Sequence, residues 1–204
     1  MIVTLSRLWL LAIVSFVLQG CTLTPSAPLS TVQITPEVKV TLPSPNELGQ
    51  HISATQLITA TWQTEQGQQT QQLPVQLQVD ANKVVLAGFS SWGTRLLSLT
   101  YQDGEIETQV LSGLENTLPQ PEQVLFNLMI TLWPQQAWEA PLNQVKWRLI
   151  DSTNQRTIID NNGKETLRIE YENGRGFDGT VYFYSVQNHY SITIETLNYQ
   201  ITQP

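Results

Sequence analysis

The chain has few of the residues that form disulfides, metal sites and nucleic-acid interfaces. Its 204 residues include one cysteine and two histidines, which excludes an intrachain disulfide and leaves few ligands for a Cys/His zinc site. Only 13% of the residues are charged, about half the usual share of roughly 25%. Acidic residues outnumber basic ones by 17 to 10, and the net charge of -7 repels phosphate. We therefore expect no nucleic-acid partner.

The sequence also lacks a recognisable catalytic cluster. Neither His51 nor His189 has a carboxylate or cysteine at ligand spacing. The segment Gly174-Arg175-Gly176-Phe177-Asp178-Gly179 matches the letters of a dinucleotide-binding loop. It lies between two predicted strands and not between a strand and a helix, so we interpret it as a hairpin turn. We predict no enzyme activity, no catalytic residue, no cofactor and no metal site.

The first apolar run is too short to cross a membrane. Residues 1–20 contain one charge, Arg7, which is followed by the apolar segments Leu8–Val14 and Phe16–Leu18. A transmembrane helix needs about 20 apolar residues, whereas the core of a signal peptide needs roughly 7–15. We predict that residues 1–20 are a signal peptide.

The apolar run ends in Leu18-Gln19-Gly20-Cys21, which resembles the bacterial lipobox that precedes an acylated cysteine. We predict that the mature protein begins at Cys21 and that palmitate and other acyl chains on this residue anchor it to membrane lipid, since each buried CH₂ contributes about 0.8 kcal/mol. Among Gram-negative lipoproteins, an aspartate after the cysteine implies the inner membrane; Thr22 implies the outer membrane, facing the periplasm. An ordinary signal peptide that precedes a cysteine by chance is the alternative.

Proline is dense after the cysteine. Five prolines lie within residues 22–53, and this density disfavours helices and central strands. We predict that residues 21–54 form a lipidated, proline-rich tether and N-terminal segment, and that residues 55–204 form a single domain. Short edge strands at Val32-Gln33-Ile34 and Val38–Leu42 are the alternative for part of the tether.

Alternating apolar and polar residues dominate the predicted domain. Short segments of this kind, separated by Asn, Asp and Gly, are typical of an antiparallel meander. In the last segment Ile192 and Ile194 share one face while Leu197 and Tyr199 share the other, which predicts a bulge near Glu195-Thr196. The predicted strands are Val75–Val79, Val84–Phe89, Leu96–Tyr101, Ile106–Leu111, Val145–Leu149, Leu167–Tyr171, Thr180–Val186 and Tyr190–Tyr199.

One segment breaks the alternation and predicts a helix from Pro121 to Trp133. It begins at a proline, has Glu122 in its first turn and stops before Pro134. Eight of the ten residues from Val124 to Trp133 are apolar, so the helix needs cover on most sides. It either packs as a core helix on a sheet or lines a cavity inside a curved sheet; a buried strand is a further alternative.

The segment Phe89–Leu99 places Trp92 before Gly93 at a predicted turn between two strands. Exposing an indole at a turn is costly unless it meets a membrane, a partner or a lid. We interpret Trp92 and Gly93 as a tip that contacts membrane or cargo. Folding of Trp92 back onto the core is the alternative.

Several motifs in the same order resemble the LolA/LolB superfamily. They are the lipobox, the Trp92-Gly93-Thr94-Arg95 turn, the proline-flanked helix Pro121–Trp133 and the strand His189–Ile194. Together they are similar to LolB-related outer-membrane lipoproteins often encoded with aryl-polyene biosynthesis genes, over roughly Gln56 to Tyr199. The resemblance implies a mainly β (α+β) fold: an incomplete antiparallel β-barrel with a short helical lid or plug over an apolar cavity that accepts acyl chains.

The resemblance also implies the function that we expect, which is binding of a lipid or acyl-type cargo and assistance in its transport or insertion. Its partners would be this ligand and a periplasmic carrier or pathway proteins. Arg95 would tie the lid or meet a headgroup, with a solvated strand arginine as the alternative, and Trp92 would lie at the rim. A structural or assembly lipoprotein without a ligand is the second possibility. The expected cavity lining is Leu96, Leu99, Leu125, Leu128, Met129 and Leu132.

Overall fold

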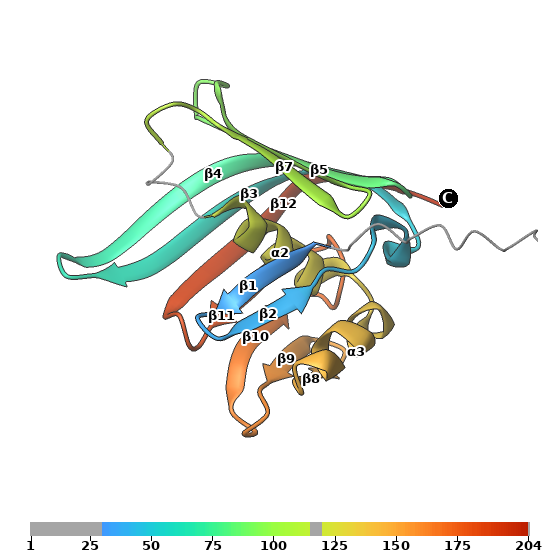
Figure 1. Ribbon diagram of the computed structural model, residues 1–204. Coiled ribbons are helices and arrows are strands. Elements are labelled where there is room, and N and C mark those ends of the chain that lie inside the picture. The colour runs from blue at the N-terminus through green and yellow to red at the C-terminus, as the bar shows by residue number, and fades with distance from the viewer. Residues whose placement is uncertain (1–29, 115–119, 204) are drawn as a thin grey trace, which may run out of the picture.

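A ten-stranded antiparallel sheet makes up most of the protein (Figure 1). The computed structural model describes residues 30–114 and 120–203. The strand order is β7-β6-β5-β4-β3-β12-β11-β10-β9-β8, and the edge strands β7 and β8 do not pair with each other. The sheet curves without closing, which confirms the predicted incomplete barrel. Its strands are β3 (His51–Thr64), β4 (Gly67–Val79), β5 (Lys83–Phe89), β6 (Arg95–Gln102), β7 (Glu105–Val110), β8 (Arg148–Asp151), β9 (Gln155–Ile159), β10 (Glu165–Tyr171), β11 (Thr180–Ser185) and β12 (Tyr190–Thr202).

The alternation predicted from the sequence separates the two faces of this sheet. In β4, Val75, Leu77 and Val79 are buried on the concave face, while Gln76 and Gln78 are exposed on the convex face. Glutamine and threonine, which carry no charge, thus cover the outside of strands whose inside is apolar. This arrangement explains how a chain with few charged residues keeps a polar surface.

The predicted bulge is present in β12. The strand pairs with β3, and its register shifts between Thr196 and Asn198, which leaves Leu197 without a partner residue. Leu197 is 62% exposed. The extra residue Leu197 therefore causes the change of face that predicted a bulge near Glu195-Thr196.

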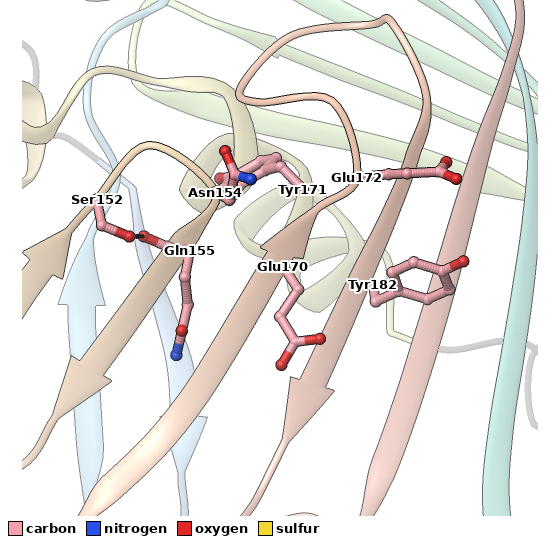
Figure 2. Close-up of a pocket in the computed structure, with 7 residues that line it drawn as sticks. All are labelled: Ser152, Asn154, Gln155, Glu170, Tyr171, Glu172 and Tyr182. Atoms are coloured by element: carbon pink, nitrogen blue, oxygen red, sulfur yellow. Dashed lines mark hydrogen bonds between the residues drawn. The ribbon is translucent and has the colours of Figure 1, made fainter.

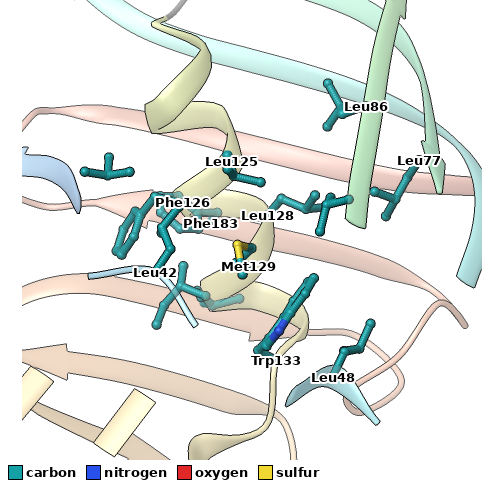
Figure 3. Close-up of a cluster of buried hydrophobic side chains, with 14 of the residues drawn as sticks. Leu42, Leu48, Leu77, Leu86, Leu125, Phe126, Leu128, Met129, Trp133 and Phe183 are labelled. Carbon is teal, nitrogen blue, oxygen red and sulfur yellow. The ribbon is translucent and has the colours of Figure 1, made fainter. Parts of the chain in front are cut away.

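The predicted helix is α2 (Pro121–Leu132), and Trp133 caps its C-terminus. Seven consecutive residues, Leu125–Thr131, are buried, so nearly two full turns of the helix have no side in water. One side of α2 faces the concave surface of the sheet, and Leu125, Leu128 and Met129 lie among apolar side chains of its strands (Figure 3).

The other side of α2 is covered by a hairpin that replaces much of the predicted tether. Strands β1 (Thr31–Thr35) and β2 (Val38–Thr41) pair in antiparallel fashion, and β1 contacts α2 (Figure 1). Val32, Val40 and Leu42 are buried in the main core. The tether prediction is therefore wrong for the hairpin, and the short-strand alternative holds there. Prolines did not prevent these strands because they lie outside them, with Pro36 in the turn.

The predicted boundary between residues 54 and 55 also differs from the structure, because it falls inside β3. A short 3₁₀ helix, η1 (Pro45–Leu48), connects the hairpin to that strand. The signal peptide (1–20), Cys21 and residues 22–29 lie outside the described residues, so those predictions stand as predictions.

A second helix, α3 (Gln135–Gln144), was not predicted, because it is rich in glutamine and contains Pro141. It packs against β8 and β2. Trp138 of α3 is fully buried and meets Phe126 of α2 edge to face, with ring centroids 5.6 Å apart. Neither α2 nor α3 has the length and hydropathy that a membrane-spanning helix requires.

A buried arginine holds the C-terminal end of α2. Arg156 of β9 is 1% exposed, and its Nη1 donates hydrogen bonds to the carbonyl oxygens of Ile130, at 2.6 Å, and Trp133, at 2.8 Å. Its Nη2 lies 2.9 Å from Asp151 Oδ2, which also accepts a hydrogen bond from Arg175. The last carbonyls of a helix have no partner within the helix, and Arg156 supplies one for two of them.

Replacing Arg156 by alanine is expected to lower the free energy of unfolding by about 3–5 kcal/mol, because Asp151 and two helix carbonyls lose their buried partner. Arg168→Ala is the control. Its partners Glu165 and Glu170 are more than a third exposed, so the loss should be below about 1 kcal/mol. Urea denaturation of the non-acylated protein measures both; equal losses would show that Arg156 does not hold α2.

Tyr171 links β10 to the same end of α2, donating a hydrogen bond from its hydroxyl to the Thr131 carbonyl oxygen at 2.8 Å. Burial raises the pKa of Tyr171 to about 12, from an ordinary value of 10.0. The raised pKa stabilises the folded protein below pH 10, and this contribution disappears as the pH rises toward 12.

Tyr171→Phe should therefore cost about 0.5–1.5 kcal/mol at neutral pH and should make the loss of stability between pH 10 and 12 shallower. Tyr101→Phe is the matched control. Burial also raises the pKa of Tyr101 to about 12, but among the described residues its buried hydroxyl has no hydrogen-bond partner. That variant should be at least as stable as the parent at neutral pH. Urea denaturation over a pH series tests both, and a larger neutral-pH loss for Tyr101→Phe would contradict the assignment.

Candidate functional site

Part of the concave face lies open toward the N-terminal end of α2. There β3, β4 and β12 continue with apolar side chains on the same face as the core, and these side chains are half-buried. Ile58 pairs with Leu73, and Trp62 pairs with Tyr190. Asn127 of α2 donates a hydrogen bond to the Tyr190 hydroxyl at 3.1 Å, which places the helix beside them. We name this group the open strip: Ile58, Ala60, Trp62, Leu73, Tyr190 and Ile192.

A glycine keeps the floor of the open strip flat. Gly88 of β5 lies next to Leu73, and a Cβ at this position would come within 2.7 Å of Leu73 Cδ2 and 3.1 Å of Leu97 Cγ. Only glycine allows Leu73 and Leu97 to approach the strand this closely. Apolar side chains therefore run from the open strip into the core through Leu73 and Val75 of β4, whereas Gln56 of β3 and Gln69 and Gln71 of β4 are polar residues of the same face.

The Trp92 turn is ordered by its own backbone. Ser90 accepts a hydrogen bond from the Gly93 amide at 2.9 Å, and its hydroxyl oxygen accepts one from the Thr94 amide at 3.1 Å. Gly93 has a φ of +79°, which favours glycine. Trp92 is 93% exposed, so its indole is not folded onto the core. Arg95, at the start of β6, is also exposed.

The predicted lining residues fall into two groups. Leu99, Leu125 and Met129 are 0% exposed, so they face no cavity large enough for water, because a side chain lining such a cavity would keep accessible surface. These three are packed core residues, and Figure 3 shows Leu125 and Met129 among them. The other group keeps some exposed surface. Leu128 is 6% exposed, and Leu132 and Leu96 are half-buried, with Leu96 at a bulge in the pairing of β5 with β6.

Two open hollows lie away from the predicted lining. One, of about 400 Å³, lies over the ends of β9, β10 and β11 (Figure 2). Its lining includes Glu170, Glu172 and Ser152, but no histidine, lysine, arginine or cysteine. The Ser152 hydroxyl donates to the Gln155 carbonyl oxygen at 3.0 Å, so its proton is directed to the backbone and not to a side chain. The other, of about 370 Å³, lies between the β1–β2 hairpin and the start of α2.

Metal ligands do not gather in residues 30–114 and 120–203, which hold no group of three or more histidine, cysteine, aspartate or glutamate side chains placed to bind an ion. The glycine-rich segment 174–179 connects β10 to β11, as predicted for a hairpin turn. The open strip offers apolar contact to a ligand.

The open strip was not predicted, although a signal for it exists in the sequence. From Ile52 to Trp62 every second residue of β3 faces the core side, and five of these six residues are apolar. The exception is Gln56, which is 4% exposed and donates a hydrogen bond to the Thr196 hydroxyl at 3.2 Å. This buried glutamine interrupts the alternation, and the predicted tether took in the start of the strand up to residue 54, so β3 was not recognised as one long strand.

The chain matches one protein family over most of its length. The family is described as a protein of unknown function, DUF3261, and it matches residues 53–198. The chain belongs to this family. The DUF3261 region runs from β3 into β12 and includes every strand of the curved sheet, whereas the β1–β2 hairpin precedes it. No curated protein matches the chain.

Solved structures similar to this DUF3261 protein include two bacterial proteins. A LolA superfamily protein from Nitrosomonas europaea is 6% identical, with a TM-score of 0.40, and the match covers 80% of this chain and 96% of that one. A DUF1329 family protein from Desulfovibrio piger is 7% identical, with a TM-score of 0.32, and the match covers 76% of this chain and 88% of that one. LolA is the superfamily that the sequence motifs resemble.

Leu99→Ala is expected to lower the free energy of unfolding by about 2–5 kcal/mol, because Leu99 is packed on all sides and its loss leaves a cavity. Trp92→Ala should change it by less than about 0.5 kcal/mol, because the indole is 93% exposed. Urea denaturation of both variants measures the difference. A cost below about 1 kcal/mol for Leu99→Ala would mean that this side chain borders a hollow after all.

Proposed function

We propose that this DUF3261 protein binds a lipid or acyl-type molecule on the open strip and assists its transport or insertion. The observation that carries the proposal is the continuity of a half-buried apolar surface with the core at one end of the curved sheet. Such a surface shields an acyl chain from water, and each Å² of apolar area removed contributes about 25 cal/mol.

The predicted site residues have different roles in this proposal. Leu96, Leu128 and Leu132 keep accessible surface, although Leu132 lies at the C-terminal end of α2 and so away from the open strip, whereas Leu99, Leu125 and Met129 are fully buried in the core. Trp92 and Gly93 form a rim at the same end of the sheet, and Arg95 is exposed where it can meet a polar headgroup. Transfer of this kind needs no covalent chemistry.

The cellular setting of the proposal follows from the lipobox. Acylated Cys21 anchors the protein in the outer membrane, with the domain in the periplasm. The resemblance to lipoproteins encoded with aryl-polyene genes makes an aryl-polyene lipid one ligand to test, and a periplasmic carrier or pathway protein one partner.

A second function, assembly without a ligand, is favoured by one specific observation. The burial of Leu125 and Met129 at 0% exposure means that α2 already fills the centre of the sheet. In that case the open strip would be a surface for protein contact only, and no acyl compound would bind to it.

Ala60→Glu should weaken binding of a fluorescent fatty-acid analogue at least about tenfold, equivalent to about 1.4 kcal/mol, because it places a carboxylate on the open strip. Thr61→Glu is the matched control, since the next residue of β3 points to the opposite face. Titration of the non-acylated protein measures both affinities, with circular dichroism to check folding. Equal affinities, or no binding by the parent, would contradict the lipid-binding proposal, and the latter would favour assembly.

A further inference from the structure

The domain has two distinct ends, and strand register defines them. β5 pairs with β6 from Lys83 opposite Gln102 to Phe89 opposite Arg95. The Trp92 turn follows Phe89, so it lies at one end of this hairpin, and the turn at Gly104 lies at the other. β4 pairs with β5 from Val79, opposite Val84, to Val75, opposite Gly88, and then continues beyond the Phe89 end of the hairpin. Trp62 of the open strip pairs with this continuation of β4, so it also lies beyond the Phe89 end. Trp92 and the open strip therefore share one end, which we name the Trp92 end.

The N-terminal chain enters at the opposite end. The Ser30 hydroxyl donates a hydrogen bond to the carbonyl oxygen of Gly104, in the turn between β6 and β7. The Ser30 carbonyl accepts a bond from the Leu42 amide at 2.9 Å, which fixes this entry point against β2. The C-terminal part of β12 ends on the same side, where Thr202 pairs with His51. We name this the anchor end.

The chain between Cys21 and the anchor end is short. Ser30 follows Cys21 by nine positions, so whatever its conformation this segment spans at most about 31 Å. A flexible segment of this length has a typical end-to-end distance of only about 15–18 Å. The eight residues of β6 alone separate the two ends by roughly 23 Å, and the turns add to this. If the domain stands upright on its anchor end, Trp92 could reach the anchoring membrane only with the segment nearly fully extended back along the domain.

The surface at the Trp92 end suits a protein more than a membrane. Membrane-surface contacts rely on clusters of lysine and arginine or on several apolar residues. Here Trp92 is a single exposed indole with Arg95 nearby, and the β3–β4 turn at the same end of the sheet presents exposed Glu65, Gln66 and Gln68 and no basic residue. Without Arg7 the mature chain has a net charge of -8 instead of -7, which opposes binding to anionic lipid. Tryptophan and arginine within a polar rim are typical of protein interfaces.

We propose that the Trp92 end faces away from the anchoring membrane and docks a protein partner, which has an apolar pocket for the indole and a carboxylate for Arg95. The proposal rests on the acylation of Cys21 within the proposed function. It means that ligand at the open strip exchanges with this partner and not with the membrane that holds the protein.

Orientation is tested with the full-length acylated protein in vesicles of phosphatidylethanolamine and phosphatidylglycerol that contain a headgroup-labelled energy acceptor. Because acylation consumes Cys21, a new cysteine is the only free thiol. Ser91→Cys places a donor dye at the Trp92 end and keeps Trp92, and Asn82→Cys places it in the exposed β4–β5 turn at the anchor end.

We expect clearly stronger energy transfer from the label at position 82 than from the label at position 91. Equal or stronger transfer from position 91 would overturn the orientation. A variant with about 20 added Gly/Ser residues after Thr22 should reduce the difference, because a longer tether lets the domain reorient. The measurement needs no ligand, so it is independent of lipid binding; failure of the protein to associate with vesicles would instead refute the anchor.

The partner is tested by a photo-crosslinking residue at position 91 in intact cells. We expect a discrete protein adduct that Trp92→Glu abolishes, and no such adduct from position 82. The absence of a Trp92-dependent protein adduct at position 91 would overturn the docking proposal, whether or not bound ligand is also crosslinked there. Trp92→Glu should leave the free energy of unfolding unchanged, since the side chain is 93% exposed.

Discussion

A helix of twelve residues with seven consecutive buried positions has to be kept from water on all its sides. A single curved sheet can cover only one side of such a helix, and the fold solves this by placing a separate hairpin on the other. The β1–β2 hairpin, α3 and the ten-stranded sheet therefore share one core, in which α2 is the central element. Removing the cover from either side would expose leucine, methionine and phenylalanine side chains that each contribute about 1.5–3 kcal/mol when buried.

Burying the helix creates a second requirement, because the carbonyl groups at its C-terminal end are buried with it. Arg156 and Tyr171 meet this requirement from neighbouring strands, and Asp151 compensates the charge of the arginine. The N-terminal half of α2 is held differently. Asn127 contacts Tyr190, and Gln123 donates to Asn127 at 3.0 Å, so this half is tied by neutral groups beside the open strip. The helix is thus held by an arginine and a tyrosine at its C-terminal end and by neutral amide and hydroxyl groups in its N-terminal half.

The sequence was sufficient to predict the sheet and α2, because their signals are local. Alternation located most strands, prolines bounded the helix, and a change of face near Glu195 located the bulge. The hairpin and α3 could not be predicted in the same way. Their stability comes from contacts with α2 and β8 that are distant in sequence, and Pro36, Pro141 and many glutamines obscure their own patterns. The site was predicted only in part, because periodicity shows which residues face inward but not which of them the helix covers. Leu99 and Ile58 face the same side, yet only Leu99 is fully buried.

The open edge of the sheet has a mechanical consequence. In a closed barrel every strand has two neighbours, so the barrel cannot widen without breaking backbone hydrogen bonds. Here β7 and β8 are not paired with each other, and the ladder that joins the ten strands is continuous from one edge to the other. The sheet can change its curvature by small rotations between strands while every one of these ladder bonds stays intact. The volume enclosed by the concave side is therefore set by side-chain packing and not by the number of hydrogen-bonded strands, as it would be in a closed barrel.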